Sequence, residues 1–427
     1  MAQLKDDCFA FGGDLMPLDD ALSLLRENVD VVVATETVPL RQAQARILAE
    51  DITSERNVPP HDNSAVDGYA VYFDDLKADG DTRLAVTGRI AAGHPLGRPA
   101  ERGQALRIFT GAPMPDGVGG GPDTIFMEED CTREETADGE VVVLPPGLKQ
   151  GSNRRFAGED VKAGDVIIRS GARLRPQEIG LAASVGRDTL AVYTRLRAAV
   201  FSTGDEVRDP GAEAAEGCIY DANRYAVMAL LEGLGCDVTD LGILQDATGA
   251  ITQALAKAAP NHDLLVTSGG VSAGEEDHVK DAVEGLGKIN FWRLAIKPGR
   301  PIALGQVGDV AFLGLPGNPV AAMVTFMVIG RPLVLMLSGA AGETAHHFQV
   351  QAGFDYKKKK GRREWARVRL EINGDGHPVA MKHHSSGAGI LTSMVEADGL
   401  VELDEDLEKL EKGAMVRFLP FNELTGR

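Results

Sequence analysis

One short segment of the sequence, Thr267–Asp277, combines hydroxyl side chains, glycines and carboxylates at a density that indicates ligand binding. It comes directly after an apolar run and leads into a helical pattern, so unpaired backbone N–H groups at the helix start would attract an anion such as phosphate. Gly269, Gly270 and Gly274 permit the tight bends and close backbone approach that this needs. The segment lacks the lysine of a P-loop and the spacing of a dinucleotide-binding loop, and an ordinary strand-to-helix turn is the alternative.

Three other segments carry similar side chains after apolar runs: Ser202–Glu206, Gln245-Asp246 and Gly314–Pro319. In an open α/β sheet, ligands bind outside the carboxyl ends of the strands, so these segments are expected at one shared edge. Glu206, Asp246 and Asp277 would then offer the oxygen ligands that Mg²⁺ prefers. Each of the three carboxylates taken alone is equally well explained as a solvated surface group.

A small group of cations, Arg293, Lys297 and Arg300, surrounds a Pro-Gly turn in a chain that is otherwise acidic. The chain has 44 lysine and arginine residues against 63 aspartate and glutamate residues, which gives a net charge of −19. That balance excludes a general nucleic-acid binder and a protein that binds anionic membranes by charge. The local cations favour a clamp for one small anion, although a solvated turn is the alternative. The basic run at residues 357–363 is interpreted as a solvated turn, with contact to an anionic ligand as the alternative.

The elements that must position these residues follow from hydrophobic spacing. Leucines at helical spacing predict a helix over residues 17–48, and a second helical pattern covers 153–186. Between them, short alternating runs separated by Gly, Pro and Asp predict a β-rich insert. Residues 195–337 alternate strand and helix patterns, which predicts a mostly parallel sheet covered on both faces. From residue 346 onward, alternating runs with Asn-Gly and Asp-Gly turns predict a small β-barrel or sandwich.

Three polar segments in and after the insert mix carboxylates, hydroxyls and aromatic rings: Pro59–Ala70, Phe109–Pro115 and Asn153–Asp160. They are either structured turns or parts of a site. The four cysteines form no C-x-x-C pair, so free thiols are expected rather than a zinc site. The N-terminus has no basic-then-apolar leader pattern, and no run reaches about 18 uninterrupted apolar residues, so a cytoplasmic protein without a membrane segment is expected.

Five segments, in this order along the chain, resemble the MoeA family of molybdopterin molybdenumtransferases, which includes the E domain of gephyrin-type proteins. They are Pro60–Ala70, Phe109–Pro113, Ser202–Glu206, Thr267–Asp277 and Gly314–Pro319. The resemblance spans nearly the whole chain and implies an α/β plus β fold with four domains. These are a discontinuous helical domain at 14–52 plus 153–190, a β-rich insert at 53–152, a doubly wound α/β domain like that of MogA at 191–338, and a C-terminal β-barrel at 344–427.

The resemblance also implies an activity. Family members insert molybdenum from molybdate into adenylylated molybdopterin, with Mg²⁺-assisted release of AMP, to form molybdenum cofactor. The implied assembly is a homodimer whose site lies between the α/β domain of one subunit and the β-rich insert of the other. A MogA-type adenylyltransferase and molybdoenzyme maturation proteins are implied partners, while nucleic acid and membranes are not.

Two alternatives stay open at this point, an adenylyltransferase activity of the MogA type and a non-catalytic molybdopterin-binding scaffold. The flanking segments with their own motifs weigh against the first, because that activity needs only the α/β domain. The carboxylates of the implied site are all present, which favours an enzyme over a scaffold. The sequence does not distinguish molybdate from tungstate, since both are tetrahedral oxyanions.

Functional positions of the family match this sequence residue by residue. The positions implied in catalysis are Asp67, Thr110, Glu206, Asp246, Asp277 and Lys297. Glu206, Asp246 and Asp277 would also hold Mg²⁺, and Asp67 and Thr110 would reach over from the partner subunit. The implied binding positions are Asp160, Ser202, Thr203, Gly204, Ser268, Gly269, Gly270, Ser272, Gly274, Arg293, Pro298, Gly299, Arg300, Pro316, Gly317 and Asn318.

Two features depart from the family pattern. Arg293 and Arg300 stand where the family often has lysine. At these positions a planar guanidinium therefore replaces a compact ammonium, which keeps the charge but changes the geometry of the donors. In the C-terminal part, Ser385–Gly389 matches the family's Gly/Ser-rich segment only loosely. No contribution of the barrel to the site is therefore assigned.

Overall fold

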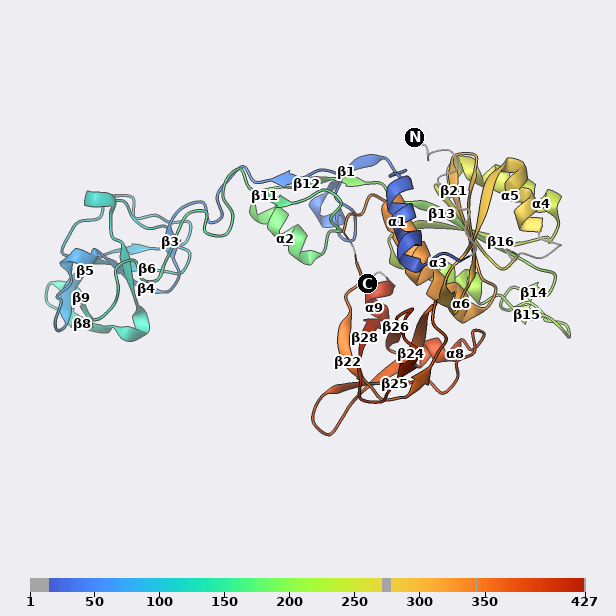
Figure 1. Ribbon diagram of the computed structural model, residues 1–427. Coiled ribbons are helices and arrows are strands. Elements are labelled where there is room, and N and C mark those ends of the chain that lie inside the picture. Colours follow the sequence, from blue (N-terminus) through green and yellow to red (C-terminus); the bar gives the residue numbers. More distant parts are fainter. Residues whose placement is uncertain (1–14, 271–277, 343, 426–427) are drawn as a thin grey trace. The chain divides into compact units, whose positions relative to one another are not determined.

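The computed structural model describes residues 15–270, 278–342 and 344–425 (Figure 1). The chain divides into two compact units. The main unit comprises residues 1–50, 170–175 and 189–427, and the β-rich unit comprises residues 51–169 and 176–188. The finer division into four domains stays a prediction.

The main unit contains a six-stranded sheet with the order β16-β13-β17-β21-β20-β18. Its strands are β13 (Arg197–Thr203), β16 (Asp237–Leu244), β17 (Leu264–Ser268), β18 (Gly287–Arg293), β20 (Pro301–Val307) and β21 (Val310–Leu315). The first four strands of that order are parallel, and β20 and β18 run antiparallel to their neighbours. The predicted mostly parallel sheet is confirmed. Strands β18 and β20 were not predicted, because Pro298 and Gly299 between them are typical of loops.

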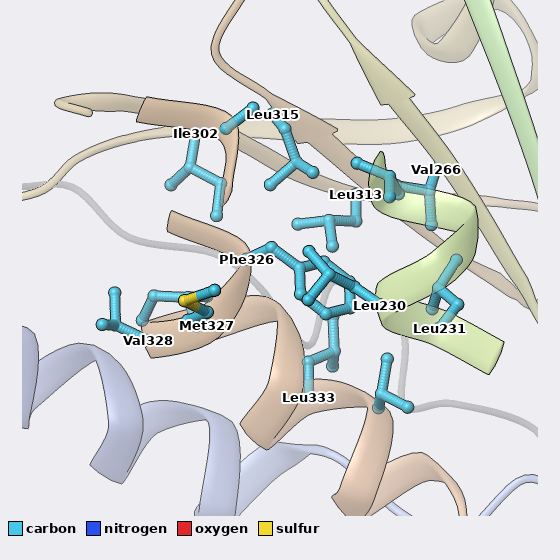
Figure 2. Close-up of a cluster of buried hydrophobic side chains, with 14 of the residues drawn as sticks. Leu230, Leu231, Val266, Ile302, Leu313, Leu315, Phe326, Met327, Val328 and Leu333 are labelled. Atoms are coloured by element: carbon cyan, nitrogen blue, oxygen red, sulfur yellow. The ribbon is translucent and has the colours of Figure 1, made fainter. Parts of the chain in front are cut away.

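Helices cover both faces of this sheet (Figure 1). One face packs against α1 (Leu18–Asn28), α3 (Asn223–Gly233), α6 (Pro319–Thr325) and α7 (Arg331–Leu337), and the other against α4 (Thr248–Ala258) and α5 (His278–Leu286). Successive strand residues point to opposite faces, so Val200 of β13 joins the first core and Phe201 the second. Figure 2 shows the first core, where Phe326 lies beside Leu230 of α3 and Leu313 of β21.

The helical segment Pro319–Leu337 runs through α6, a π-helical turn (Phe326–Gly330) and α7. Among the described residues it is the one helix long and apolar enough to cross a membrane, with 19 residues and a mean hydropathy of 2.1. Its apolar window is 83% buried inside the protein, and a core helix meets the same criteria of length and composition. Its packing against the sheet accounts for its composition.

The first helix is shorter than predicted. α1 ends at Asn28, and residues 35–39 form β1 (Thr35–Pro39), which pairs antiparallel with β12 (Thr189–Tyr193). The run of valines at 31–33 is β-branched, which favours extended chain over helix. The prediction of a helix over 153–186 is also wrong for most of that range, because only α2 (Pro176–Ser184) is an α-helix there.

The C-terminal part of the main unit is a closed five-stranded barrel, which confirms the predicted fold class. Its strands are β22 (Phe348–Ala352), β24 (Arg363–Ile372), β25 (Pro378–Lys382), β26 (Gly399–Leu403) and β28 (Met415–Pro420). The barrel closes because β24 pairs with both β25 and β26. The short strand β19 (Ile296–Lys297) pairs in parallel with the start of β24 and so joins the α/β part to the barrel. Smaller elements here are β14 (Val207–Arg208), β15 (Ile219–Tyr220), β23 (Tyr356–Lys357), β27 (Lys409–Leu410), α8 (Thr392–Val395) and α9 (Phe421–Leu424).

The β-rich unit is built on a six-stranded sheet with the order β7-β4-β6-β5-β9-β8. Its strands are β4 (Gly68–Val71), β5 (Thr82–Ile90), β6 (Gln104–Ile108), β7 (Thr124–Met127), β8 (Thr132–Thr136) and β9 (Gly139–Leu144). Two short ladders extend it, β2 (Ile52–Thr53) with β11 (Val166–Ile168) and β3 (Asn63–Ser64) with β10 (Arg154–Arg155). The alternating runs of the sequence correctly predicted a β-rich segment here.

Candidate functional site

Two neighbouring cavities lie at the carboxyl ends of the parallel strands of the main unit. The first, the strand-end pocket, has a volume of about 230 Å³. The second, the barrel-side pocket, has a volume of about 680 Å³ and is lined by both the α/β part and the barrel. Glu206, Gly269, Gly270 and Gly317 line both cavities, so the two are continuous along this edge.

The strand-end pocket is lined by residues of all four polar segments expected at the strand ends. From Gly314–Pro319 the lining residues are Gly317 and Pro319. Of the expected binding and metal positions it is lined by Ser202, Thr203, Gly204, Glu206, Asp246, Ser268, Gly269, Gly270 and Gly317. The side chains of β13 and β17 arrive there because both strands are parallel and paired in register. This is the edge at which open α/β sheets bind ligands.

The backbone of this pocket depends on glycine at Gly270. Gly270 has a φ of +63°, and a Cβ there would lie 2.7 Å from Thr203 Oγ1 and 3.0 Å from a methyl carbon of Val279. Three buried hydroxyls at this edge, of Ser202, Thr267 and Ser268, have no hydrogen-bond partner among the described residues. Two of them, the hydroxyls of Ser202 and Ser268, belong to residues that line the pocket, where they can form hydrogen bonds with a polar ligand.

A buried arginine fixes the loop that carries Glu206. Arg224 is 1% exposed and its guanidinium contacts Asp209 of that loop, Asp221 (Nε to Oδ2, 3.2 Å) and Asp240 of β16 (Nη1 to Oδ1, 3.0 Å). The loop is further closed by the β14–β15 pairing. The sequence analysis missed Arg224, because only Asp221 lies near it in sequence, and Asp209 and Asp240 are brought to it by the fold.

The barrel-side pocket gathers cations from two parts of the chain. Lys297 of β19 and Arg300 come from the segment between β18 and β20, as the sequence suggested. Pro298, Gly299, Pro316 and Asn318 line the same cavity. The barrel adds Arg362, Arg367 and Lys382, none of which was among the expected binding residues. The interpretation of 357–363 as a solvated turn is therefore wrong for Arg362. The interpretation as a solvated turn does not fit Lys358 either, because the Lys358 Nζ donates to backbone carbonyls, for example that of Leu407 at 3.0 Å.

The barrel cations are held in place by the protein itself. Arg367 is 4% exposed, and its guanidinium donates to Ser393 Oγ (3.1 Å) and to the carbonyls of Ser385 (3.1 Å) and Gly387 (3.2 Å). Burial lowers the pKa of Lys382, and the charges of Arg367 and Lys297 lower it further. Cations crowded in this way are stabilised by a bound anion.

Several expected residues lie elsewhere. Arg293 is exposed at the end of β18 and does not line either cavity as the described residues define them. Ser272, Gly274 and Asp277 lie outside the described residues. Glu206 and Asp246 both line the strand-end pocket, but no group of three or more His, Cys, Asp or Glu side chains among the described residues forms a metal cluster.

The expected residues Asp67, Thr110 and Asp160 belong to the β-rich unit. One carboxylate oxygen of Asp67 accepts hydrogen bonds from the backbone N–H and the hydroxyl of Thr110, both at 2.7 Å. These hydrogen bonds hold the pKa of Asp67 below its ordinary value, so the carboxylate is ionised. Asp160 is exposed, and its backbone N–H donates to the carbonyl of Val58 at 3.0 Å.

The chain matches three family models that together span most of its length. The MoeA N-terminal region (domain I and II) matches residues 16–186, the "Probable molybdopterin binding domain" residues 199–335, and the MoeA C-terminal region (domain IV) residues 349–421. Each covers a part of the chain with its own described sheet.

Curated relatives and solved structures agree with these matches. The molybdopterin molybdenumtransferase of Haemophilus influenzae is 39% identical over 413 residues, which cover 96% of this chain and 100% of the relative. That of Nostoc is 34% identical over 396 residues, 90% of this chain and 89% of the relative. A crystal structure of the molybdopterin biosynthesis MoeA protein from Pyrococcus horikoshii superposes with a TM-score of 0.79 at 28% identity, covering 95% of this chain and 100% of that one. The chain therefore belongs to the MoeA family of molybdopterin molybdenumtransferases, which are transferases of molybdenum cofactor biosynthesis.

Proposed function

We propose that this protein inserts molybdenum from molybdate into adenylylated molybdopterin, with Mg²⁺-assisted release of AMP. The observation that carries the proposal is the pairing of the two cavities. A pocket with glycine backbone and with hydroxyls that lack a partner among the described residues suits the phosphate of a pterin, and a cationic pocket beside it suits a small oxyanion. Both groups must meet for the metal to be transferred, and the cavities share four lining residues.

The residues of the strand-end pocket fit a hard cation. Glu206 and Asp246 offer carboxylates and Ser202 and Ser268 offer buried hydroxyls, which together are the oxygen ligands that Mg²⁺ takes. Bound there, Mg²⁺ would neutralise negative charge on the phosphoanhydride oxygens. The chain's own contribution is to hold the pyrophosphate against the backbone of Gly269 and Gly270 and to keep it near the cations of the barrel-side pocket.

The oxyanion end of the proposal rests on the five cations that line the barrel-side pocket, namely Lys297, Arg300, Arg362, Arg367 and Lys382. Charge neutralisation and positioning supply most of the catalysis in phosphoryl transfer, with little covalent chemistry required of the protein. Lys297 and Arg300 can reach a molybdate oxygen from the α/β side, while Arg367 is fixed on the barrel side by its carbonyl contacts.

The assembly and location belong to the same proposal. A second copy of the chain would bring Asp67 and Thr110 to the strand-end pocket, where the ionised Asp67 can position a water or a proton-bearing group. The reaction is placed in the cytoplasm. A MogA-type adenylyltransferase would supply the substrate, and molybdoenzymes would receive the product.

The test is AMP release from adenylylated molybdopterin with molybdate and Mg²⁺. Asp246→Ala should lower the rate by at least about a hundredfold, because it removes charge from the site of the phosphoanhydride. Asp237→Ala, at the start of β16, the strand that precedes Asp246, is the matched control and should leave the rate unchanged. A wild-type rate in Asp246→Ala would overturn the assignment of this pocket. Consumption of ATP, with release of pyrophosphate as free molybdopterin is adenylylated, would indicate the adenylyltransferase instead.

A further inference from the structure

The barrel-side pocket contains a buried carboxylate among its cations. Glu364 is 2% exposed, and its Oε2 accepts hydrogen bonds from Lys297 Nζ at 3.2 Å and from the Tyr356 hydroxyl at 2.9 Å. Arg362 lies near the other oxygen, with Nη2 3.8 Å from Oε1. Burying a charge is costly, and a carboxylate in an anion pocket also repels the ligand. The presence of the Glu364 carboxylate in this pocket therefore needs a functional explanation.

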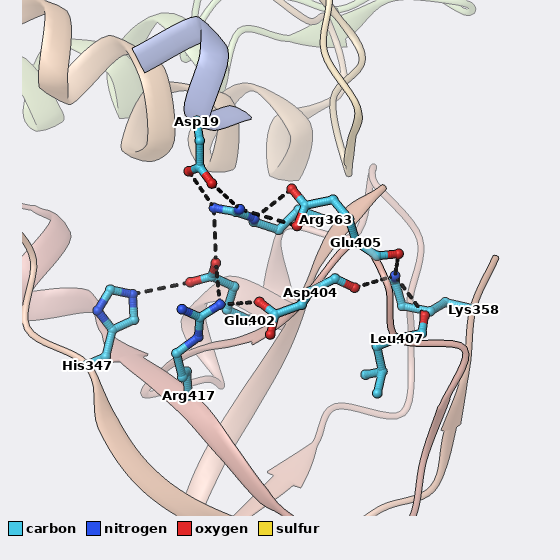
Figure 3. Close-up of polar contacts among 9 residues, drawn as sticks. All are labelled: Asp19, His347, Lys358, Arg363, Glu402, Asp404, Glu405, Leu407 and Arg417. Atoms are coloured by element: carbon cyan, nitrogen blue, oxygen red, sulfur yellow. Dashed lines mark hydrogen bonds and ion pairs between the residues drawn. The ribbon is translucent and has the colours of Figure 1, made fainter. Parts of the chain in front are cut away.

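The position of Glu364 is fixed by the attachment of the barrel. Lys297 and Glu364 are register partners in the β19–β24 pair, and the Arg363 N–H donates to the Ala295 carbonyl at 2.8 Å. The neighbouring side chain, Arg363, contacts Asp19 of α1 (Nη2 to Oδ2, 2.8 Å), Glu405 (Nε to Oε1, 2.9 Å) and Glu402 (Nη1 to Oε1, 3.3 Å), as Figure 3 shows. Glu364 therefore has little freedom to leave Lys297.

The Lys297 ammonium interacts with Glu364 and would at the same time attract an oxyanion that enters the pocket. The Lys297 side chain is 47% exposed, so its ammonium is accessible to a ligand while it contacts Glu364. A carboxylate about 3 Å from the ammonium offsets much of the attraction that Lys297 exerts on a dianion, since Coulomb interactions in a partly buried site are only weakly screened. Tyr356 donates to the same oxygen and keeps the carboxylate oriented toward Lys297.

We propose that Glu364 is a fixed counter-charge that sets how tightly the barrel-side pocket holds its oxyanion. The inference rests on the proposed function, in which that oxyanion is molybdate. An oxyanion that is to be transferred has to give up all of its contacts with the pocket. Affinity that is equal in the ground state and the transition state lowers KM without raising kcat, so a pocket with five uncompensated cations would retain the anion without benefit.

The test is the dissociation constant of molybdate, measured by isothermal titration calorimetry on the full-length protein. Glu364→Gln keeps the shape of the side chain and an acceptor for Tyr356 but removes the charge, so the Kd should fall by about tenfold. In the insertion assay the KM for molybdate should fall by a similar factor with no gain in kcat. A residue with a purely structural role would raise the Kd instead.

Two controls separate charge from structure. Glu371→Gln removes an exposed carboxylate farther along the same strand, outside the pocket, and should leave the Kd unchanged. Tyr356→Phe removes the hydrogen bond that orients Glu364 but leaves its charge in place, so the Kd should fall much less than in Glu364→Gln. If Glu364→Gln does not fold, Glu364→Asp serves, because the shorter carboxylate withdraws from Lys297 and should lower the Kd by a few fold.

The outcomes also separate this inference from the proposed function. Equal Kd values of wild type and Lys297→Ala for molybdate would show that the pocket does not bind molybdate. This result would contradict the proposed function. The other informative result is that Lys297→Ala loses molybdate binding while Glu364→Gln binds molybdate no tighter than wild type. This result would contradict the role of Glu364 as a counter-charge and would leave the proposed function intact.

Discussion

At the scale of single residues, two buried charges of the main unit are compensated by oppositely charged side chains. Arg224 meets Asp209, Asp221 and Asp240, and Glu364 meets Lys297. A buried ion pair adds little net stability compared with apolar packing, but removing one partner leaves the other charge buried and costly. The sites therefore depend on each member of these groups.

Arg224→Met tests this dependence. It leaves Asp221, whose side chain is 3% exposed, without its cation, so we expect the free energy of unfolding to fall by about 3–5 kcal/mol. Urea denaturation measures this, and limited proteolysis should show faster cleavage in the loop at 204–220. Arg195→Met, which loses one hydrogen bond from an exposed side chain to the Gly235 carbonyl, is the control and should cost about 1 kcal/mol at most. Equal stabilities of the two variants would contradict the assigned role.

At the scale of elements, α1 and the start of β24 are joined by an ion pair between Asp19 and Arg363. The hydrogen bond from Arg363 lowers the pKa of Asp19. A carboxyl with a lowered folded-state pKa stabilises the fold above its unfolded pKa of about 3.9, and this contribution is lost as the pH falls through the folded-state value. The link between helix and barrel should thus weaken in acid.

Asp19→Asn tests this link. The Asp19 side chain is 71% exposed, so solvent screening limits the expected loss at pH 7 to about 1 kcal/mol or less. The difference in melting temperature between wild type and variant, present at pH 7, should shrink in acid as the pH falls through the lowered folded-state pKa of Asp19. Asp20→Asn, on the next residue of the same helix, should show no such difference at either pH. A difference that persists unchanged in acid would argue against the ion pair.

At the scale of the whole molecule, the proposed site divides its residues between the two units. Asp67 and Thr110 belong to the β-rich unit, and Glu206 and Asp246 to the main unit. The proposed homodimer pairs the β-rich unit of one copy with the main unit of the other. In a two-fold symmetric dimer this arrangement makes two identical sites, each with residues from both copies.

Mixing two inactive variants tests the shared site. Asp67→Ala and Asp246→Ala, each inactive alone, are co-expressed or unfolded and refolded together. Half of the dimers formed at random are mixed, and one of the two sites in a mixed dimer carries neither substitution, so about a quarter of the wild-type AMP release should return. Light scattering on the same samples should give twice the chain mass of 45.3 kDa. A dimer that recovers no activity would show that each site is built within one copy.

Much of the fold could be predicted from the sequence because it depends on short-range patterns. The alternation of strands and helices over 195–337 and the turn residues of the barrel are local, and both were predicted correctly. The helix predicted over 17–48 failed where helical leucine spacing gives way to β-branched residues after Asn28. Strands β18 and β20 were missed because Pro298 and Gly299, which lie between them, are typical of loops.

The sequence by itself determined the polar edge of the sheet, since Ser202–Glu206, Asp246 and Ser268–Gly270 each lie at or just after the end of a strand and parallel strands end together. Only the tertiary structure decided that the barrel belongs to the site. Arg362, Arg367 and Lys382 meet Lys297 because β19 pairs with β24. That pairing joins Lys297 to Glu364 across 67 residues of chain, and such a contact depends on closure of the whole intervening fold rather than on any local pattern.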